Sequence, residues 1–144
     1  MKCMKNFKIK YKDNYFELKY NNCFISFLVE KELWEKNELY KNLNKSFYSN
    51  IRLISFYSQY DINKPRIKKG LSKKLFYYSL NYLLSKKIIN INDIIVLEAN
   101  PSNYNSLVEK VYIPMGFKII TNEYNDFSGF TLMSCKVVDI LIYN

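Results

Sequence analysis

The sequence predicts an α+β protein with a mixed β-sheet. Alternating apolar and polar residues fill most of the first third, a pattern typical of half-buried strands. An amphipathic helical stretch at 71–87 lies between apolar stretches at 51–62 and 93–100, and a second helical stretch follows at 101–112. A strand, a helix and a strand in this order usually form a crossover between parallel strands. We therefore expect parallel and antiparallel pairs in one sheet, with helices flanking it.

Length and composition favour a folded intracellular protein. A chain of 144 residues with 49% hydrophobic residues can bury a sizeable core, so we expect a single domain over 1–144. No apolar run is long enough to cross a membrane, and the N-terminal sequence MKCMKNFKIKYK has no apolar segment of the secretory kind. The expectation is a cytoplasmic protein that does not insert into membranes.

The charge and the missing histidines exclude several function classes. The formal net charge is +9, which suggests nucleic acid, but among the 22 basic residues only Arg52 and Arg66 are arginines. Bidentate readout of phosphates and bases favours arginine, so we do not expect dedicated nucleic-acid binding. With no histidine and three widely spaced cysteines, the common zinc sites and histidine-dependent triads are excluded. We expect no metal site.

The first third contains three predicted strands and one helix. Residues 7–11 and 15–20 alternate in polarity, and a third strand is expected at 23–30. Asn21-Asn22 is a plausible two-residue hairpin turn, because asparagine tolerates positive φ. Residues 31–43 contain good helix formers with an irregular apolar stripe, and we expect a helix there.

The middle of the chain predicts a strand, a turn and the clearest helix. Residues 51–62 are rich in β-formers and end at the segment NKPRIKKG. The helix expected at 71–87 has two distinct faces. Its apolar face would carry Leu71, Leu75, Tyr78, Tyr82 and Leu83, and its other face Lys73, Tyr77, Asn81 and Ser85.

The last third predicts a buried strand, a helix and further strands. Residues 93–100 form a continuous apolar run, and 101–112 group their apolar residues at helical spacing. Pro114 should stop this helix, and Gly116 should supply the left-handed residue that follows it. Strands are then expected at 117–121, 127–138 and 140–143.

The turn before helix 71–87 is a candidate phosphate site. A strand that enters a helix through a glycine-containing turn leaves backbone amides unpaired at the positive end of the helix dipole. Gly70 would allow a ligand to approach the backbone closely, and Ser72 is small. The surrounding lysines, Lys68, Lys69, Lys73 and Lys74, would favour a polyphosphate. The alternative is an ordinary lysine-rich helix start.

Two motifs in this order resemble the GNAT superfamily of acetyl-CoA-dependent N-acetyltransferases. The family's pyrophosphate loop, Q/R-x-x-G-x-G/A, corresponds to residues 67–72, with Ile67 at the usual Gln or Arg position. Its N-x-x-A-x-x-L-Y-x-x-x-G-F pattern is similar to Asn105, Val108, Val111, Tyr112, Gly116 and Phe117. The resemblance spans roughly Arg52 to Phe130 and leaves 1–50 as an atypical N-terminal part.

The resemblance implies direct attack of a primary amine on acetyl-CoA. Two central strands, 51–62 and 93–100, would diverge at their C-terminal ends, and Tyr60 to Asn63 would line the acetyl group. The family's cofactor contacts map onto Ile62, Asn63, Lys68, Lys69, Gly70, Leu71, Ser72, Lys73 and Asn105. Tyr112 would protonate the departing thiolate. The acceptor, a small molecule or a protein, is left open.

Several alternatives stay open. Asp61 and Glu98 are nominal general bases, but a chain of waters could serve instead, and no base is assigned. With 14 tyrosines in the chain, Tyr112 could equally be a core residue. The whole protein could be an acyl-CoA-binding module without turnover. A basic nucleic-acid-binding protein is the remaining alternative.

Overall fold

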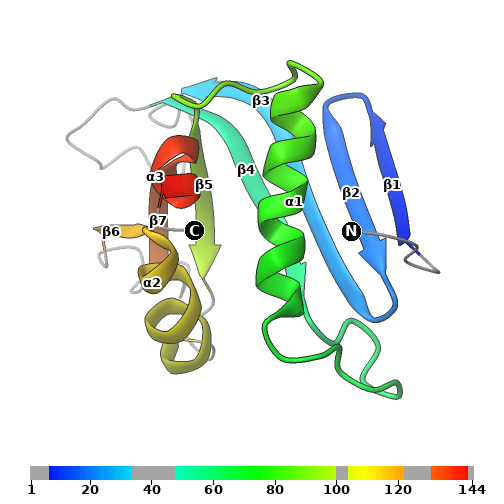
Figure 1. The fold of residues 1–144 in the computed structure, drawn as a ribbon. Helices are drawn as coiled ribbons and strands as arrows, with labels where there is room; N and C mark the ends of the chain where they lie inside the picture. The colour runs from blue at the N-terminus through cyan, green and yellow to red at the C-terminus, as the bar shows by residue number, and fades with distance from the viewer. Residues whose placement is uncertain (1–6, 34–47, 100–103, 122–130, 143–144) are drawn as a thin grey trace. The chain divides into compact units, whose positions relative to one another are not determined.

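The protein is an α+β protein whose strands form one mixed sheet, as predicted. The computed structural model describes residues 7–33, 48–99, 104–121 and 131–142. Seven strands hydrogen-bond in the order β1-β2-β3-β4-β5-β7-β6 (Figure 1). Their bounds are β1 Phe7–Lys12, β2 Tyr15–Tyr20, β3 Cys23–Leu33, β4 Tyr48–Tyr57, β5 Ile94–Ala99, β6 Lys118–Thr121 and β7 Thr131–Lys136. β4 and β5 pair in parallel, which confirms the predicted crossover through the intervening helix.

The chain divides into two compact units, which we describe separately. Unit 1 comprises Met1–Val29 and Leu53–Ile89, and unit 2 comprises Glu30–Arg52 and Asn90–Asn144. The α1 helix, Leu71–Ser85, belongs to unit 1. Unit 2 contains the π-helix η4, Tyr104–Tyr112, together with α2, Ile113–Met115, and α3, Val137–Ile142. That 1–144 is a single domain stays a prediction.

Two tight turns shape the antiparallel part of unit 1. β1 pairs with β2, and β2 pairs with β3, at the predicted positions. The first turn has Asp13 at φ 53° and Asn14 at φ 66°, so both residues adopt the conformation that suits a two-residue hairpin. The predicted Asn21-Asn22 turn is confirmed. Of its two residues only Asn21, at φ 48°, has a positive φ. Asn22 has a different role, described below.

Aromatic rings join α1 to the strands of unit 1. Figure 1 shows α1 lying along β2 and β3 within this unit. Phe76 packs against Phe27 with ring centroids 5.4 Å apart and against Phe56 at 5.0 Å. Phe7, at the start of β1, contacts Tyr78 with ring centroids 5.2 Å apart, and Phe16, near the start of β2, contacts Tyr82 at 5.8 Å. Burial of such rings is a main source of stability in a small unit.

The buried face of α1 differs from the predicted one by about one residue. Leu75 and Leu83 are buried as expected, whereas Leu71, Tyr78 and Tyr82 are only half-buried. The Tyr78 ring packs edge-on against Phe7 of β1, and the Tyr82 ring packs at a tilt against Phe16 of β2. The centre of the face is taken by residues that sequence analysis did not select, namely Phe76, Ser79 and Leu80.

The helix expected at 31–43 is wrong at its start. β3 continues to Leu33, and the rest of the predicted helix lies outside the described residues. The strand expected at 51–62 is also shifted, since β4 begins at Tyr48 and ends at Tyr57. Residues 58–62 instead form a loop that side-chain and backbone hydrogen bonds draw toward Asn22.

Unit 2 is built on antiparallel pairs around β7. β5 pairs with β7 from Ile94–Lys136 to Ala99–Thr131, and β6 pairs with β7 on its other side. The strands expected at 93–100 and 117–121 are confirmed to within one residue at each end of the described range. The strand expected at 127–138 is described only from Thr131, and it ends at Lys136.

The strand expected at 140–143 is wrong, because α3 occupies Val137–Ile142. The apolar run can follow either a strand or a helix period. The helix prevails because the amides of Val137 and Val138 donate to the carbonyls of Asp93 and Ile91, at 2.9 and 2.8 Å. These bonds satisfy two amides at the helix start, and Val137 and Ile140 are then buried on one face.

The helix ahead of β6 continues past Pro114, contrary to the prediction. η4 ends at Tyr112 and α2 follows directly, with Pro114 in its first turn. The predicted left-handed residue is confirmed, since Gly116 has φ 116° and ends α2.

Candidate functional site

The turn between β4 and α1 has an open, uncapped helix start. Gly70 precedes the helix at φ 85°, and a Cβ placed there would meet nothing within 4 Å. No side chain caps the helix, and among the described residues the amides of Ser72 and Lys73 have no acceptor. The Leu71 amide is used, because it donates to the Lys68 carbonyl at 3.0 Å. Two free amides therefore point from the positive end of α1.

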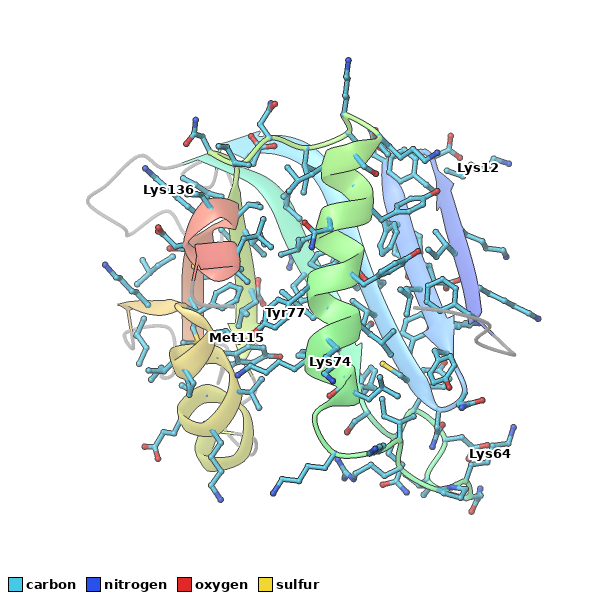
Figure 2. All side chains as sticks on the ribbon, viewed as in Figure 1. Lys12, Lys64, Lys74, Tyr77, Met115 and Lys136 are labelled. Atoms are coloured by element: carbon cyan, nitrogen blue, oxygen red, sulfur yellow. The ribbon has the colours of Figure 1, made fainter. Side chains whose placement is uncertain are left out.

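Lysine side chains surround this turn. Lys68, Lys69 and Lys74 are exposed and Lys73 is half-exposed. Figure 2 shows Lys74 on the first turn of α1 and Lys64 on the loop that leads to it. The arrangement can bind an anion by combining backbone donors with mobile positive charges. It has the features that the sequence predicted for residues 68–73, except that the Leu71 amide is occupied.

Ile62 and Asn63 lie in a loop and not at the end of a strand. Ile62 is 83% exposed, and the Asn63 amide donates to Asp61 Oδ1 at 2.9 Å. The expectation that the strand runs to Ile62 is therefore wrong, whereas the role of Tyr60 to Asn63 in lining the acetyl group stays a prediction. The loop departs from the strand because the amides of Tyr60 and Asp61 bond to the backbone and side chain of Asn22.

Asn22 was predicted only as a turn residue, yet it organises this loop. Its side-chain Nδ2 donates to the carbonyls of Asp61, Lys64 and Pro65, at 2.9, 3.2 and 3.0 Å. Its Oδ1 accepts from the Asp61 amide at 2.8 Å, and the residue is only 6% exposed. The sequence shows Asn22 only as the second residue of a predicted turn. This signal is too weak to predict contacts with residues about forty positions later in the chain.

The two nominal bases have partners of their own. Glu98 Oε1 accepts from Arg52 Nη2 at 2.9 Å, within unit 2. Asp61 Oδ1 accepts from the Asn63 amide. Both carboxylates therefore have a structural role in addition to any catalytic one.

Tyr112 lies in the core of unit 2. It is 6% exposed, and its ring meets that of Phe117 edge-on, with centroids 5.8 Å apart. Its carbonyl accepts from the Phe117 amide at 3.0 Å across the Gly116 turn. Asn105 lies one turn or more earlier in η4, and its side chain is outside what the structure describes.

The predicted site residues thus fall into two groups. Ile62, Asn63 and residues 68–73 belong to unit 1, whereas Asn105 and Tyr112 belong to unit 2. β4 and β5 pair at Ile51–Ile95 and Arg52–Val96, close to the start of the described part of β4. The assembly of both groups at one cleft between diverging strands stays a prediction.

Three buried polar groups outside these positions were not predicted. The hydroxyls of Ser26 and Tyr77 are buried without a hydrogen-bond partner among the described residues, and burial raises the pKa of Tyr77. Cys23 is 1% exposed, and burial raises the pKa of its thiol to about 12. A thiol with such a pKa is protonated near neutral pH, so Cys23 is not a candidate nucleophile.

Comparison with known proteins identifies a shared fold. No protein-family model matches the sequence, and no curated protein matches it. A solved structure described as "Crystal structure of bacterial toxin" is similar over 89% of this chain and 69% of that chain, with a TM-score of 0.55 and 15% sequence identity. At this identity, the likeness indicates a common fold and nothing about activity. Within the described residues, no helix combines the length and the apolar character that crossing a bilayer requires.

Proposed function

We propose that this protein is a GNAT-like N-acetyltransferase that moves an acetyl group from acetyl-CoA to a primary amine. The observation that carries the proposal is the turn between β4 and α1. Gly70 at φ 85° opens an uncapped helix start with two free amides and four nearby lysines. Such a turn suits a diphosphate, and it lies at the position that the family's pyrophosphate loop would occupy between a strand and an amphipathic helix.

Two sets of residues would carry the chemistry. The amides of Ser72 and Lys73 would hold the pyrophosphate of acetyl-CoA, with Lys68, Lys69, Lys73 and Lys74 balancing its charge. The amine would attack the thioester carbonyl, forming the C–N bond as the C–S bond breaks. Tyr112 would then donate its hydroxyl proton to the departing thiolate and recover one of the two protons that the attacking nitrogen loses. The excess proton of the ammonium acceptor would leave through water.

The direct test is acetyl transfer to a panel of primary amines. The purified protein would be incubated with acetyl-CoA and small amines, or with peptides that offer an α-amine or a lysine. Free coenzyme A would be followed with a thiol reagent and the acetylated amine by mass spectrometry. Equal amounts of both products are expected. Coenzyme A release without an acetylated amine would indicate hydrolysis, and release at the protein-free rate for every amine would count against the proposal.

A second test addresses the turn itself. Gly70→Val places a branched side chain where the diphosphate would approach, so acetyl-CoA affinity should fall by about tenfold or more. Valine at φ 85° is also strained, and Asn14→Val provides a matched control because Asn14 has φ 66° in the same unit. If both variants bind acetyl-CoA as the wild type does, the turn is only a helix start.

A binding module without turnover is the second candidate. The observation in its favour is the burial of Tyr112 against Phe117, which gives this tyrosine a packing role without any proton transfer. In that case acetyl-CoA would stabilise the protein against heat, and Gly70→Val would remove the effect, but no amine would be acetylated.

A further inference from the structure

A hollow in unit 1 lies beside residues 67–72, the turn that leads into α1, which we call the α1 turn. Apart from Lys68, the residues that line this hollow have no role in the chemistry above. It has a volume of about 780 Å³ and lies between the β2–β3 turn and the loop that precedes α1. We call it the hairpin hollow. Its walls include Tyr20 and Asn21 on one side, and Lys64, Arg66, Lys68 and Leu71 on the other. This volume falls in the range of small-molecule sites and greatly exceeds that of inorganic phosphate.

The hairpin hollow has a preformed wall. Asn22, 6% exposed, fixes the loop through three bonds from Nδ2 and one to Oδ1, as described above. Gln59 Nε2 adds a bond to the Lys64 carbonyl at 3.0 Å. A wall held in this way is already ordered before a ligand binds, so binding costs less conformational entropy.

The charge of the hairpin hollow selects an anion. The charged side chains that line it, among the described residues, are Lys64, Arg66 and Lys68. Arg66 is oriented, because its Nη1 donates to Ser58 Oγ at 2.6 Å and its Nη2 approaches Gln59 Oε1 at 3.4 Å. An adjoining hollow of about 520 Å³ shares Lys64, Asn21 and Asn22 and adds Asp61. The positive character is therefore concentrated on the α1 side.

The remaining lining is apolar and aromatic. Tyr20, Ile67 and Leu71 are each half-buried and offer flat or aliphatic surface beside the cations. A ligand that matches both parts carries phosphate at one end and a planar ring at the other. Neither inorganic phosphate nor an apolar molecule would use the whole surface.

We propose that the hairpin hollow binds a phosphorylated nucleoside. Its phosphates would contact Lys64, Arg66 and Lys68, and its base would lie against Tyr20 and Leu71. Lys68 and Leu71 also belong to the α1 turn, so a ligand whose diphosphate lies on that turn could continue into the hollow. The nucleotide end of coenzyme A is thus one source of this chemistry, and that assignment rests on the proposed function. A free nucleotide is the other source.

Calorimetric titration of the full chain at fixed ionic strength tests the proposal. The probes are adenosine bisphosphate, adenosine, inorganic phosphate, coenzyme A and pantetheine. Adenosine bisphosphate should bind more tightly than adenosine or phosphate. The variant Lys64→Gln/Arg66→Gln should weaken it by about tenfold or more, since it removes two charge-assisted contacts. Its matched control is Lys86→Gln/Lys87→Gln, which loses the same charge at the far end of α1.

The outcomes separate the hollow from the acetyltransferase proposal. If adenosine bisphosphate and coenzyme A both lose affinity in the first variant only, the hollow holds the nucleotide end of coenzyme A. If only the free nucleotide binds, the hollow is confirmed while the acetyl-CoA proposal fails. Equal loss in both double variants would indicate general electrostatic attraction and overturn the inference. Unchanged nucleotide binding in the first variant would also overturn it, even if coenzyme A binds elsewhere.

Loss of the Arg66–Ser58 bond could disturb the loop in the double variant. Lys64→Gln alone avoids this, because the contacts that hold the loop at Lys64 come from its carbonyl and amide. Lys64→Gln should retain the wild-type melting temperature and still weaken adenosine bisphosphate binding about threefold or more. Wild-type affinity in this variant, in a folded protein, would exclude Lys64 from the site and contradict the proposal.

Discussion

The α1 turn and the end of the helix at Gly116 carry the two motifs, and they are built in opposite ways. The exposed lysines of the α1 turn follow a loop, residues 61–65, that the buried side chain of Asn22 holds in place. Around Gly116, the motif residues are themselves the core, with Tyr112 6% and Phe117 2% exposed. In the first region, the side chain that supports the backbone differs from the candidate binding residues. In the second, the candidate catalytic residue is itself part of the core.

This difference determines how each motif can be interpreted. Tyrosine, glycine and phenylalanine at 112, 116 and 117 are explained in part by packing and by a left-handed turn, so their spacing alone does not require catalysis. The exposed lysines of the α1 turn have no such packing explanation. A substitution there should alter binding with little change in stability, whereas one at Tyr112 must remove a single atom to be informative.

The largest expected effect is that of Tyr112→Phe on turnover. The ring and its contact with Phe117 stay, and only the hydroxyl is lost, so kcat for acetyl transfer should fall about 10²–10⁴-fold if the hydroxyl is the general acid. Acetyl-CoA affinity should be nearly unchanged. Steady-state kinetics and calorimetric binding measure the two quantities.

Tyr78→Phe is the control for this substitution, because the Tyr78 ring also packs edge-on against a phenylalanine, Phe7. It should retain wild-type kcat. Wild-type turnover in Tyr112→Phe would show that Tyr112 is only a core tyrosine. The proton for the thiolate would then have to come from solvent. Denaturation curves of both variants show whether stability has changed.

Asn22→Ala should have the largest effect on stability. It removes all four side-chain bonds that tie the β2–β3 turn to the loop at 61–65, so the free energy of unfolding should fall by about 1–3 kcal/mol. Urea denaturation measures the loss. The loop should also become more accessible, seen as faster amide hydrogen exchange at Asp61 and Lys64.

Asn63→Ala provides the comparison, since Asn63 is exposed in the same loop. It should change the free energy of unfolding by about 0.5 kcal/mol or less. If the two variants are equally stable, Asn22 does not hold the loop, and the contrast between the two regions is lost.

The two glycines test the same contrast at the backbone. Both have positive φ, 85° at Gly70 and 116° at Gly116, so alanine at either should cost about 1–2 kcal/mol in strain. The added Cβ would make only ordinary van der Waals contact at Gly116, 3.4 Å from Cys135 Sγ and 3.8 Å from the Asp139 carbonyl oxygen, and would meet nothing within 4 Å at Gly70. The φ of Gly116 lies further from the left-handed minimum near about 57° than that of Gly70, so Gly116→Ala should be the less stable variant by thermal denaturation. The reverse order would contradict backbone strain as the main cost at these two positions.

How far the sequence predicted this structure depends on the range of the interactions. Local signals were sufficient for β2, α1 and the Gly116 turn, because polarity alternation, helix periodicity and glycine preference act over a few residues. The end of β4 was missed because Asn22, far away in the chain, draws residues 60–65 out of the strand. α3 was missed for a similar reason, since the carbonyls of Ile91 and Asp93 complete its start.

The candidate site follows the same rule. The anion-binding character of residues 68–73 depends on a local helix start and could be predicted, whereas the hairpin hollow needs the β2–β3 turn and the α1 loop together. The burial of Tyr112 could not be inferred from a motif that treats it as catalytic, because the contact with Phe117 arises only once Gly116 reverses the chain.

The smallest expected effect compares one buried thiol from each unit. Burial raises the pKa of Cys23, in unit 1, to about 12. Burial, and secondarily Asp139, raises the pKa of Cys135, in unit 2, to about 11, while Lys118 lowers it. The ordinary value is 9.0, so above that pH the unfolded chain releases protons that the folded protein retains. Stability from these thiols is thus complete below the ordinary pKa and is lost as the pH rises toward the folded values.

Cys23→Ala and Cys135→Ala should therefore each weaken the alkaline loss of stability. For one proton, the difference in slope approaches about 1.4 kcal/mol per pH unit once the unfolded thiol is ionised. Urea denaturation from about pH 8 to about pH 10, under reducing conditions, measures the slope, and lysine titration common to all variants cancels in the comparison. The change in slope should be similar for the two variants in this pH range. The two changes should diverge only near pH 11, the lower of the two folded pKa values, which belongs to Cys135. An unchanged slope in Cys135→Ala alone would mean that its thiol ionises in the folded protein, and that Cys135 is more accessible to water than its exposed fraction of 6% indicates.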